Sequence, residues 1–529
     1  MGKTIVISLN TNSISEMPTP AEHYGRGLAT ELVRQYAKDG CSRLDEGNAL
    51  AIVCGLLTGT NAPCANRASV AAMGNNAVAV SSISGDFPQK LASLGIDALV
   101  LTGKYSDGNA VILVEASSIR IEHMPQLQGK SCSDIVEYIR STFGGNCAAI
   151  GTGRAADMLL PLGALFTTYP EGTPRFTCPR SSFGDVAASK GIRAIVINGK
   201  AYFGKRYADK ATLQANSKKL TGMILSDKIC GGALPGLGSI TILHLLKSRN
   251  AIPEIPERRA HGKRNNGSRL NYCCAPGCVI GCLNRHTAAD GHVFSAPEES
   301  EVKAAMEHCF GMMGESERAN TALALSKRGM TLGLNTTEFV YTAAMYMELN
   351  GETPSSERLM ELIGEIERGS ITGRLLGSGT VAIGSLYRDN VSIQRRITKP
   401  ANTNDSAHRL DLGKLYPELS EIDDLDMLYR QIFLLENMGI CIFSAFALIN
   451  RKEALETIAS LYGNVTGNAV SVVQLLNYAG ECLDNELQMV RSNSAACVKQ
   501  NIPEFVKVLY RYLHRLTRAH SPLSCAMDK

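Results

Sequence analysis

Four of the sixteen cysteines in this chain lie within the ten residues Cys273-Cys274-Ala275-Pro276-Gly277-Cys278-Val279-Ile280-Gly281-Cys282. Thiolates are soft ligands that suit iron-sulfur clusters, zinc or copper(I). Because proline and glycine bend this C-x3-C-x3-C run tightly, its cysteines are poorly placed to serve as separate core residues. We therefore predict that the run supplies three ligands of a metal centre and that a fourth ligand comes from a distant part of the chain.

An iron-sulfur cluster is the preferred interpretation of this run, with zinc and disulfide bonds as the alternatives. The N-terminus lacks the basic start, apolar stretch and small-residue cleavage site that mark a signal peptide. We therefore expect the protein in a reducing cytoplasm, where disulfide bonds are rare.

Length and composition indicate a globular protein. The 529 residues allow roughly three domains, and a hydrophobic content of 44% is sufficient for large cores. No run of about 18 apolar residues is present, so we expect no membrane span. The net charge is only +4 with both signs interspersed, which argues against nucleic acid as the main partner.

The first two hundred residues are β-rich and contain an internal repeat. Residues 84–104 and 183–200 each pass from a Gly-Asp loop through a short helical segment to a strand rich in Val and Ile. Two matched halves predict a duplicated sheet unit. Each loop could present backbone N–H groups to an anion, and Arg67 and Arg180 precede the first and second loops. The alternative is that the glycines merely turn the chain. The predicted strands are Thr4–Leu9, Ala98–Thr102, Ala110–Val114 and Arg193–Asn198.

The character of the sequence changes to helical from about Tyr202. Apolar residues recur at spacings of three and four in eight segments. We expect an α+β protein with a duplicated β-sheet domain over residues 1–202 and two mainly α-helical domains over 203–400 and 401–529. The predicted helices are Glu298–Gly314, Thr321–Arg328, Thr336–Glu348, Ser355–Glu367, Asp424–Leu435, Lys452–Tyr462, Val470–Leu483 and Ile502–Arg515.

Two glycine motifs stand at helix boundaries: Met330-Thr331-Leu332-Gly333-Leu334-Asn335 and Glu436-Asn437-Met438-Gly439-Ile440-Cys441. Cys441 ends the second motif, and we predict that it is the fourth ligand of the metal centre. Asn335 has a structural explanation of its own, because with Glu338 it would form a capping box at the start of a helix.

The chain resembles the tungsten-containing aldehyde:ferredoxin oxidoreductases, as a divergent and shortened member. The likeness rests on six segments in the same order, none of which is specific alone. They are Gly55-Leu56-Leu57-Thr58-Gly59-Thr60-Asn61-Ala62-Pro63 with Arg67 downstream, Arg180-Ser181-Ser182-Phe183-Gly184, the cysteine run, Ala296-Pro297-Glu298-Glu299-Ser300-Glu301, and the two glycine motifs.

The resemblance implies a tungsten or molybdenum bis-pterin cofactor beside a [4Fe-4S] cluster. Magnesium is a possible additional ion of the cofactor. The cluster ligands it implies are Cys274, Cys278, Cys282 and Cys441. The cofactor-binding residues are Arg67, Arg180, Gly184, Gly333, Asn335, Glu436 and Gly439, of which the arginines suit phosphates and Glu436 a pterin edge. The candidates for acid-base work near the metal are Glu298, Glu301 and His408.

The chain also departs from the family pattern. Met330 and Asn335 stand where the first glycine motif has carboxylates, and Cys274 gives a spacing of x3 where the family has x2. Cys273 is the only substitute nearby. The region 355–426 is shortened, and His408 is its only histidine.

The implied function is oxidation of an aldehyde to a carboxylic acid, with electrons passed through the cluster to ferredoxin or a ferredoxin-like subunit. A homodimer or hetero-oligomer is expected. The lost carboxylates favour an alternative, a non-catalytic iron-sulfur relative that acts as an electron-transfer or assembly subunit. Radical S-adenosylmethionine chemistry is a third alternative, but its C-x3-C-x2-C motif differs from the run in this chain.

Overall fold

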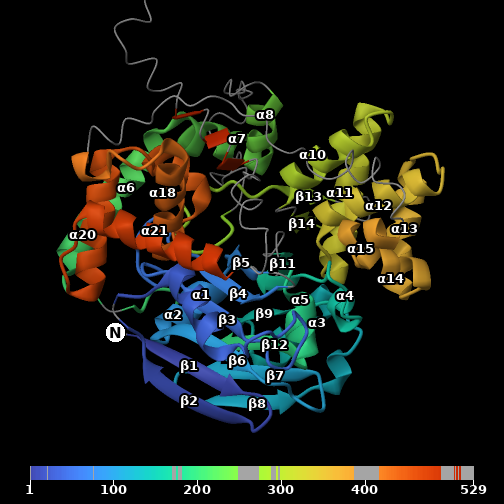
Figure 1. Cartoon of the computed structure of the whole chain (residues 1–529), viewed down its shortest axis with the longest axis horizontal. Helices are drawn as coiled ribbons and strands as arrows, with labels where there is room; N and C mark the ends of the chain where they lie inside the picture. Colours follow the sequence, from blue (N-terminus) through green and yellow to red (C-terminus); the bar gives the residue numbers. More distant parts are fainter. Residues whose placement is uncertain are drawn as a thin grey trace, which may run out of the picture.

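The computed structural model describes residues 2–20, 22–74, 77–169, 174–176, 182–199, 201–205, 207–247, 273–287, 293–295, 298–386 and 416–489, and six positions between 505 and 513. A β-rich base lies below two groups of helices (Figure 1). This architecture confirms the predicted α+β fold class, a duplicated sheet unit followed by mainly helical parts.

The first sheet has the strand order β2-β1-β6-β3-β4-β5. Its strands β1 and β6 pair in parallel, whereas the other neighbours are antiparallel. The central strands are rich in Val, Ile, Leu and Ala, which suits strands buried on both faces. The bounds are β1 (Lys3–Ser8), β2 (Ser13–Pro18), β3 (Leu50–Cys54), β4 (Ala68–Met73), β5 (Val78–Ile83) and β6 (Ile96–Thr102).

The second sheet repeats the first strand for strand. Its order is β11-β10-β9-β12-β7-β8, with β7 and β12 parallel and the other neighbours antiparallel. The predicted duplication is therefore confirmed, and it extends over the whole base. The bounds are β7 (Ala110–Glu115), β8 (Ile119–His123), β9 (Ala148–Thr152), β10 (Leu165–Thr168), β11 (Pro174–Phe176) and β12 (Ile192–Asn198).

The helices of the base occupy matching places in the two repeats. Helices α1 and α3 precede β3 and β9, and each covers the outer face of its own sheet. The short helices α2 and α5 precede β6 and β12 and pack with both sheets in one shared core. The bounds are α1 (Gly25–Tyr36), α2 (Phe87–Ser93), α3 (Cys132–Phe143), α4 (Arg154–Asp157) and α5 (Gly184–Ser189).

The two repeats exchange charged side chains across their interface. Arg43 of the first repeat forms two hydrogen bonds, both of 2.7 Å, with Asp185 at the start of α5. Arg140 of the second repeat lies 3.8 Å from Asp86 at the start of α2. Burial raises the pKa of both carboxyl groups, that of Asp86 to about 7. Each buried aspartate therefore depends on an arginine from the other repeat.

The helices above the base form two groups, one built on α10–α15 and the other on α6 and α18–α21 (Figure 1). Because α6 packs against α20, the second group is not continuous in sequence. The bounds of the first group are α10 (Glu299–Cys309), α11 (Glu315–Leu332), α12 (Thr336–Leu349), α13 (Ser356–Arg368), α14 (Ile371–Gly377) and α15 (Thr380–Leu386). Those of the second are α6 (Lys210–Ser226), α18 (Asp424–Met438), α19 (Ala445–Leu448), α20 (Lys452–Thr466) and α21 (Val472–Gln488).

Shorter elements connect these groups. The helices α7 (Leu234–Leu237) and α8 (Thr241–Lys247) follow α6, and the hairpin of β13 (Arg285–Thr287) and β14 (Val293–Ser295) follows the cysteine run. Single turns occur at η1 (Pro125–Leu127), η2 (Lys228–Ala233), η3 (Gly238–Ile240), η4 (Pro417–Leu419) and η5 (Ile442–Ser444). The predicted domain bounds at 202 and 400 stay predictions.

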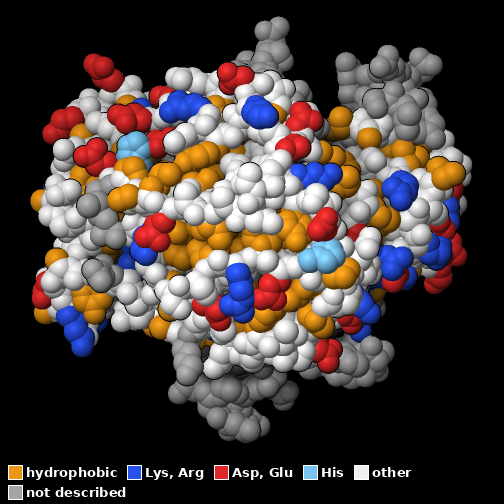
Figure 2. Space-filling model, turned by 90° about the horizontal axis from the view of Figure 1, so that it is seen from below, with side chains coloured by type: hydrophobic (Ala, Val, Ile, Leu, Met, Phe, Trp, Pro, Cys, Tyr) orange, Lys and Arg blue, Asp and Glu red, His pale blue; other side chains and the backbone are white. Residues whose placement is uncertain are grey.

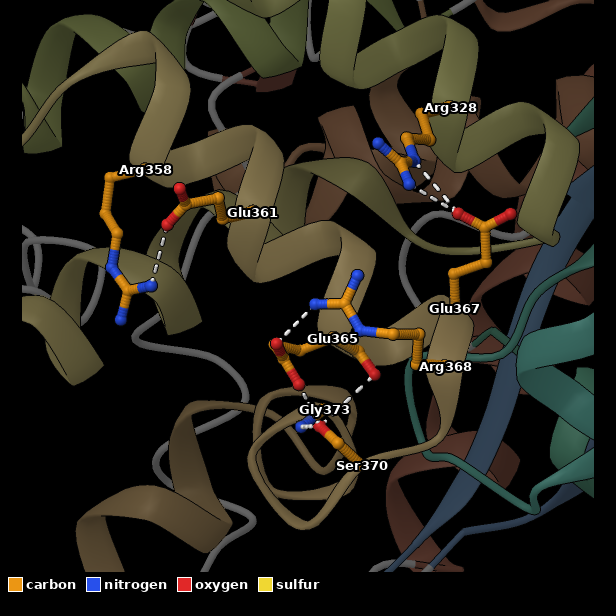
Figure 3. A network of polar contacts seen from close by, with 8 residues as sticks. All are labelled: Arg328, Arg358, Glu361, Glu365, Glu367, Arg368, Ser370 and Gly373. Carbon is orange, nitrogen blue, oxygen red and sulfur yellow. Dashed lines mark hydrogen bonds and ion pairs between the residues drawn. The ribbon is translucent and has the colours of Figure 1, made fainter.

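Polar contacts link α11, α13 and α14 on the outside of the first helical group (Figure 3). Arg328 of α11 donates two hydrogen bonds to Glu367 of α13. Ser370 caps α14 by accepting a hydrogen bond from the N–H of Gly373, and its hydroxyl donates to Glu365. Exposed pairs of this kind contribute about 0–1 kcal/mol each, so the apolar core beneath them holds the group together.

The face of the base that is turned away from the helices carries bands of hydrophobic side chains, with basic and acidic side chains interspersed (Figure 2). This face presents no extended region of one charge. Within the part of the chain that the structure describes, no helix has the length and apolar character needed to cross a membrane.

Replacing Arg43 by alanine is expected to lower the free energy of unfolding by about 3–5 kcal/mol, because the fully buried carboxylate of Asp185 loses its partner. Urea unfolding followed by circular dichroism at pH 7 measures this change. Arg120→Ala is the control, since Arg120 pairs with Glu115 and Glu122 at the surface and should cost at most about 1 kcal/mol. Equal losses in the two variants would contradict the proposed importance of the exchanged pair.

Candidate cofactor and cluster site

The site lies where the loop between β3 and β4 meets the segment that follows α18. The two segments join through backbone hydrogen bonds of 2.9–3.1 Å. Such bonds fix the relative position of the backbones whatever side chains they carry. The pairs, N–H donor first, are Leu56 with Asn437, Leu57 with Met438, Arg67 with Gly439 and Cys441 with Cys64.

Two glycines make this contact possible. Gly439 ends α18 in the left-handed conformation with φ of 78°. A Cβ atom at Gly439 would lie 2.3 Å from Oγ1 of Thr58, and one at Gly55 would lie 2.1 Å from the Cα of Gly439. Both distances are far below van der Waals contact, so the two backbones approach as closely as they do only because both residues lack a side chain.

The first glycine motif docks on the equivalent loop of the second repeat. The N–H of Ala164 donates to the carbonyl of Gly333 at 2.7 Å, and the N–H of Asn335 donates to Leu162 at 2.8 Å. Gly333 has φ of 70°, and a Cβ atom there would lie 2.9 Å from the Cα of Gly153. The two helical groups therefore dock on the two repeats in the same way.

The docking brings a cluster of cysteines together. Cys278 of the cysteine run forms a side-chain hydrogen bond with Cys64, which also lies within electrostatic reach of Cys441. Cys64 and Cys441 belong to one apolar cluster, and Cys278 and Cys282 pack against it. Cys64, Cys278 and Cys441 thus interact with one another, and Cys282 packs against the same apolar cluster. The predicted set of four cluster ligands stays a prediction.

The remaining predicted ligand, Cys274, packs in a separate small apolar cluster with Tyr169, Ala275 and Leu283. Its thiol still reaches Cys278. The thiol of Cys273 donates to the carbonyl of Cys278 at 3.2 Å. Neither Cys273 nor Cys274 thus belongs to the apolar cluster that contains Cys64 and Cys441.

The neighbouring thiols change the acidity of Cys278. The contact with Cys273 raises the pKa of its thiol, but hydrogen bonds with Cys274 and Cys64 outweigh that contact and lower the pKa to about 7. A thiol with a lowered pKa is readily deprotonated, and the thiolate is the form that binds metals. Cys278 is therefore suited to act as a ligand.

Arg67 connects the cysteines with the predicted cofactor site. Its Nη2 atom lies 3.1 Å from Sγ of Cys441, although the two residues are 374 positions apart. The neighbouring Asn66 is 1% exposed, and among the described residues neither polar atom of its amide has a hydrogen-bond partner. Since buried polar groups are nearly always paired, this amide is suited to contact a bound group.

Within the described ranges, no set of three His, Cys, Asp or Glu side chains is arranged to hold a single metal ion. A [4Fe-4S] cluster is held by four separate thiolates, each on its own iron, so its ligands surround the cluster. The donor set at this junction is therefore compatible with a cluster by its chemistry, since it consists of several soft thiols with an arginine and an unpaired amide beside them.

The predicted acid-base residues have different surroundings. Glu298 is buried at the start of α10, whereas Glu301 is exposed and accepts a hydrogen bond from Ser300. His408 lies outside the described residues. Of the predicted acid-base residues within the described part, Glu298 is thus the one in a buried position.

Glu299, which the sequence did not single out, is the centre of a polar network. It is 4% exposed and accepts hydrogen bonds from Asn284, His286 and Lys303 at 2.6–2.9 Å. Burial raises its pKa, but the contacts with His286 and Lys303 outweigh burial and lower it to about 2. The network ties α10 to the hairpin that follows the cysteine run.

Three predicted pterin or phosphate contacts have structural partners. Glu436 pairs with Arg26 of α1 at 2.5 Å. Asn335 caps α12 by accepting a hydrogen bond from the N–H of Glu338 at 3.0 Å, which confirms the predicted N-cap. The predicted capping box is wrong, because the Glu338 side chain accepts a hydrogen bond from Thr380 instead. The N–H of Gly184 donates to Gly163 at 2.9 Å, and a Cβ atom there would meet the backbone at 2.7 Å.

Arg180 lies outside the described residues. Its place in the chain nevertheless corrects the expectation that Arg67 and Arg180 hold matching positions before the two repeated loops. Arg67 precedes β4, whereas position 180 falls between β11 and α5. In the duplicated sheet the counterpart of β4 is β10, which begins at Leu165. The two arginines are therefore not at equivalent positions of the repeat.

A duplicated sheet beneath two helical groups is an architecture that has a solved representative. The chain matches the active site complex BamBC of benzoyl coenzyme A reductase, in complex with 1,5-dienoyl-CoA, over 97% of its own length and 94% of that chain. The TM-score is 0.71 and the identity 14%, so the two share a fold.

Sequence comparisons find similarity to the same family. Residues 4–199 match the family model of the aldehyde ferredoxin oxidoreductase N-terminal domain. The tungsten-containing aldehyde ferredoxin oxidoreductase of Pyrococcus furiosus is 26% identical over 43% of this chain and 37% of its own length. That of Thermococcus kodakarensis is 25% identical over 48% of this chain and 42% of its own length.

The predicted resemblance is confirmed: the chain is similar to the tungsten-containing aldehyde ferredoxin oxidoreductases, at low identity and over part of its length. It aligns with about two-fifths of the length of the curated relatives it matches.

Gly439→Ala should destabilise the protein more than Gly467→Ala. Both glycines end helices in the left-handed conformation, where alanine costs roughly 1–2 kcal/mol. Only Gly439 is packed against another backbone, whereas nothing lies within 4 Å of a Cβ atom at Gly467. The urea unfolding midpoint measures the difference, and equal shifts would show that the close contact with Gly55 is unimportant.

Glu299→Gln should make stability less dependent on pH in acid. The carboxylate has a pKa of about 2 in the folded protein and about 4.3 in the unfolded chain. It therefore stabilises the fold above pH 4.3, and this contribution, about 3 kcal/mol, is lost as the pH falls towards 2. Urea unfolding at pH 6, 5, 4 and 3 should show the two proteins converging, whereas the exposed Glu301→Gln control should follow the wild type.

Proposed function

We propose that the protein is an oxidoreductase that oxidises an aldehyde to a carboxylic acid at a tungsten or molybdenum bis-pterin centre. Electrons leave through a [4Fe-4S] cluster to ferredoxin or a ferredoxin-like subunit. The observation that carries this proposal is the contact between Arg67 and Cys441 at 3.1 Å. It makes the predicted phosphate-binding arginine and the predicted cluster cysteine direct neighbours, which would bring the pterin cofactor and the cluster close enough for electron transfer.

The residues at the junction fit both groups. Several cysteines supply soft ligands for the cluster, Arg67 supplies a cation for a phosphate, and the buried amide of Asn66 lacks a partner among the described residues. When bound, the pterin-held metal supplies the two-electron oxidation and the cluster supplies the one-electron steps.

The chain's own residues would orient the substrate and move protons. Glu298, buried at the start of α10, is our choice for the group that holds a proton at its carboxylate oxygen. Glu299 would keep α10 in place through Asn284 and His286. We further propose that the protein acts in the cytoplasm as a homodimer or hetero-oligomer.

A non-catalytic iron-sulfur relative is the second candidate. Two observations favour it: Glu436 already pairs with Arg26, and Asn335 is used as a helix cap. Neither residue then needs a pterin to explain it. Such a protein would keep the cluster and serve as an electron-transfer or assembly subunit.

Metal analysis of anaerobically purified protein separates these candidates. From cells supplied with tungsten and molybdenum, we expect about four iron and four labile sulfide per chain, one of the two heavier metals, and aldehyde-dependent reduction of a viologen dye. Iron and sulfide without either heavier metal, and without dye reduction, would overturn the enzyme and leave the second candidate.

Arg67→Ala should weaken binding of the cofactor by about tenfold to a hundredfold, because a charge-assisted hydrogen bond contributes about 1.5–3 kcal/mol. The measurement is the content of tungsten or molybdenum in the purified protein, which should fall. The control is Arg120→Ala, an exposed arginine of the same β base. Full metal content in Arg67→Ala would contradict the role of Arg67 in binding the cofactor.

A further inference from the structure

The cysteines of the run lie in two different surroundings. Cys278 and Cys282 pack against the large apolar cluster at the junction, but Cys274 lies in the separate cluster with Tyr169, Ala275 and Leu283. Cys274 is also the cysteine whose spacing departs from the family pattern. The thiol of Cys274 reaches Cys278, but Cys274 does not belong to the apolar cluster that contains Cys441. To complete a set of ligands drawn from that cluster, a different thiol would be needed beside Cys278, Cys282 and Cys441.

Cys64 is in the right place to do so. It is fully buried, forms a side-chain hydrogen bond with Cys278 and lies within electrostatic reach of Cys441. Cys64 and Cys441 belong to the same apolar cluster, against which Cys278 and Cys282 pack. Four thiols from three distant parts of the chain thus share one environment.

The backbone of Cys64 is held in an unusual conformation. Its φ of 57° is in the left-handed region, which residues with a side chain seldom adopt. Its N–H donates to the carbonyl of Gly277 and its carbonyl accepts from the N–H of Cys441, both at 2.9 Å. These bonds tie Cys64 to the cysteine run on one side and to the segment after α18 on the other. Conformations of this kind cluster at functional sites, where the surrounding structure enforces them.

We propose that Cys64 supplies the fourth thiolate of the iron-sulfur site, together with Cys278, Cys282 and Cys441, and that Cys274 is not a ligand. This inference rests on the proposed function, because it assumes that the protein binds a cluster. In this arrangement the β base contributes directly to the cluster, so the cluster holds together the three segments that meet at the junction.

The test compares single variants of the full-length protein, each purified anaerobically. Cys64→Ser should lose more than about half of the roughly four iron and four sulfide of the wild type, along with the electron paramagnetic resonance signal of the reduced cluster. Cys274→Ser should keep both. The control is Cys482→Ser, because Cys482 is buried in the same apolar cluster but its thiol contacts Asn437; it should also keep both.

A second variant separates loss of the ligand from loss of the fold. Cys64→Gly removes the thiol but suits the positive φ, so its iron-free form should unfold at the same urea concentration as the iron-free wild type, or a higher one, and still fail to retain iron. Full iron in Cys64→Ser and Cys64→Gly would overturn the inference and leave the proposed function standing. Loss of iron in Cys274→Ser would overturn the exclusion of Cys274. A wild type without iron would overturn the proposed function and the inference together.

Discussion

The close approach of Gly55 and Gly439 is the constraint on which the site depends. Backbone hydrogen bonds connect the two segments on either side of this contact. There is no room for a Cβ atom at either position. Side chains at neighbouring positions are therefore delivered to fixed places: Arg67 beside Cys441, and Cys64 beside Cys278. Because the contact is made by the backbone, it depends on the two glycines and not on the other side chains of the two segments.

The duplicated base uses this contact twice. Gly333 docks on the second repeat as Gly439 docks on the first, with a left-handed glycine against a loop glycine in each case. Thiols gather around Gly439, whereas Asn335 next to Gly333 is engaged as a helix cap. The scaffold is therefore symmetric in its docking but asymmetric in its chemistry, which concentrates the soft ligands at one junction.

Local patterns in the sequence predicted part of the elements, but the helices α1, α3 and α6 were missed. The predicted helix Ile502–Arg515 lies largely outside the described residues. The strand of Arg193–Asn198 and the helix from Asp424 correspond to β12 and α18, and the cap at Asn335 needs only residues three apart. Contacts between distant segments were not predictable, because the sequence of one segment does not specify which other segment it packs against. Examples are the contacts of Arg26 with Glu436 and of Cys64 with Cys278. The equivalence of Arg67 and Arg180 was wrong because it matched two loops without aligning the strands between them.

Arg67 has two functions in the proposed enzyme. Its guanidinium group donates to Sγ of Cys441, and hydrogen bonds to cluster sulfurs are among the factors that set the reduction potential. The same group would also neutralise a cofactor phosphate. Because a positive charge stabilises the more negative, reduced cluster, any phosphate that draws Arg67 away from Cys441 would lower the potential of the cluster. In the proposed enzyme, binding of the cofactor and the reduction potential of the cluster would therefore be coupled through the side chain of Arg67, which a sequence motif alone does not reveal.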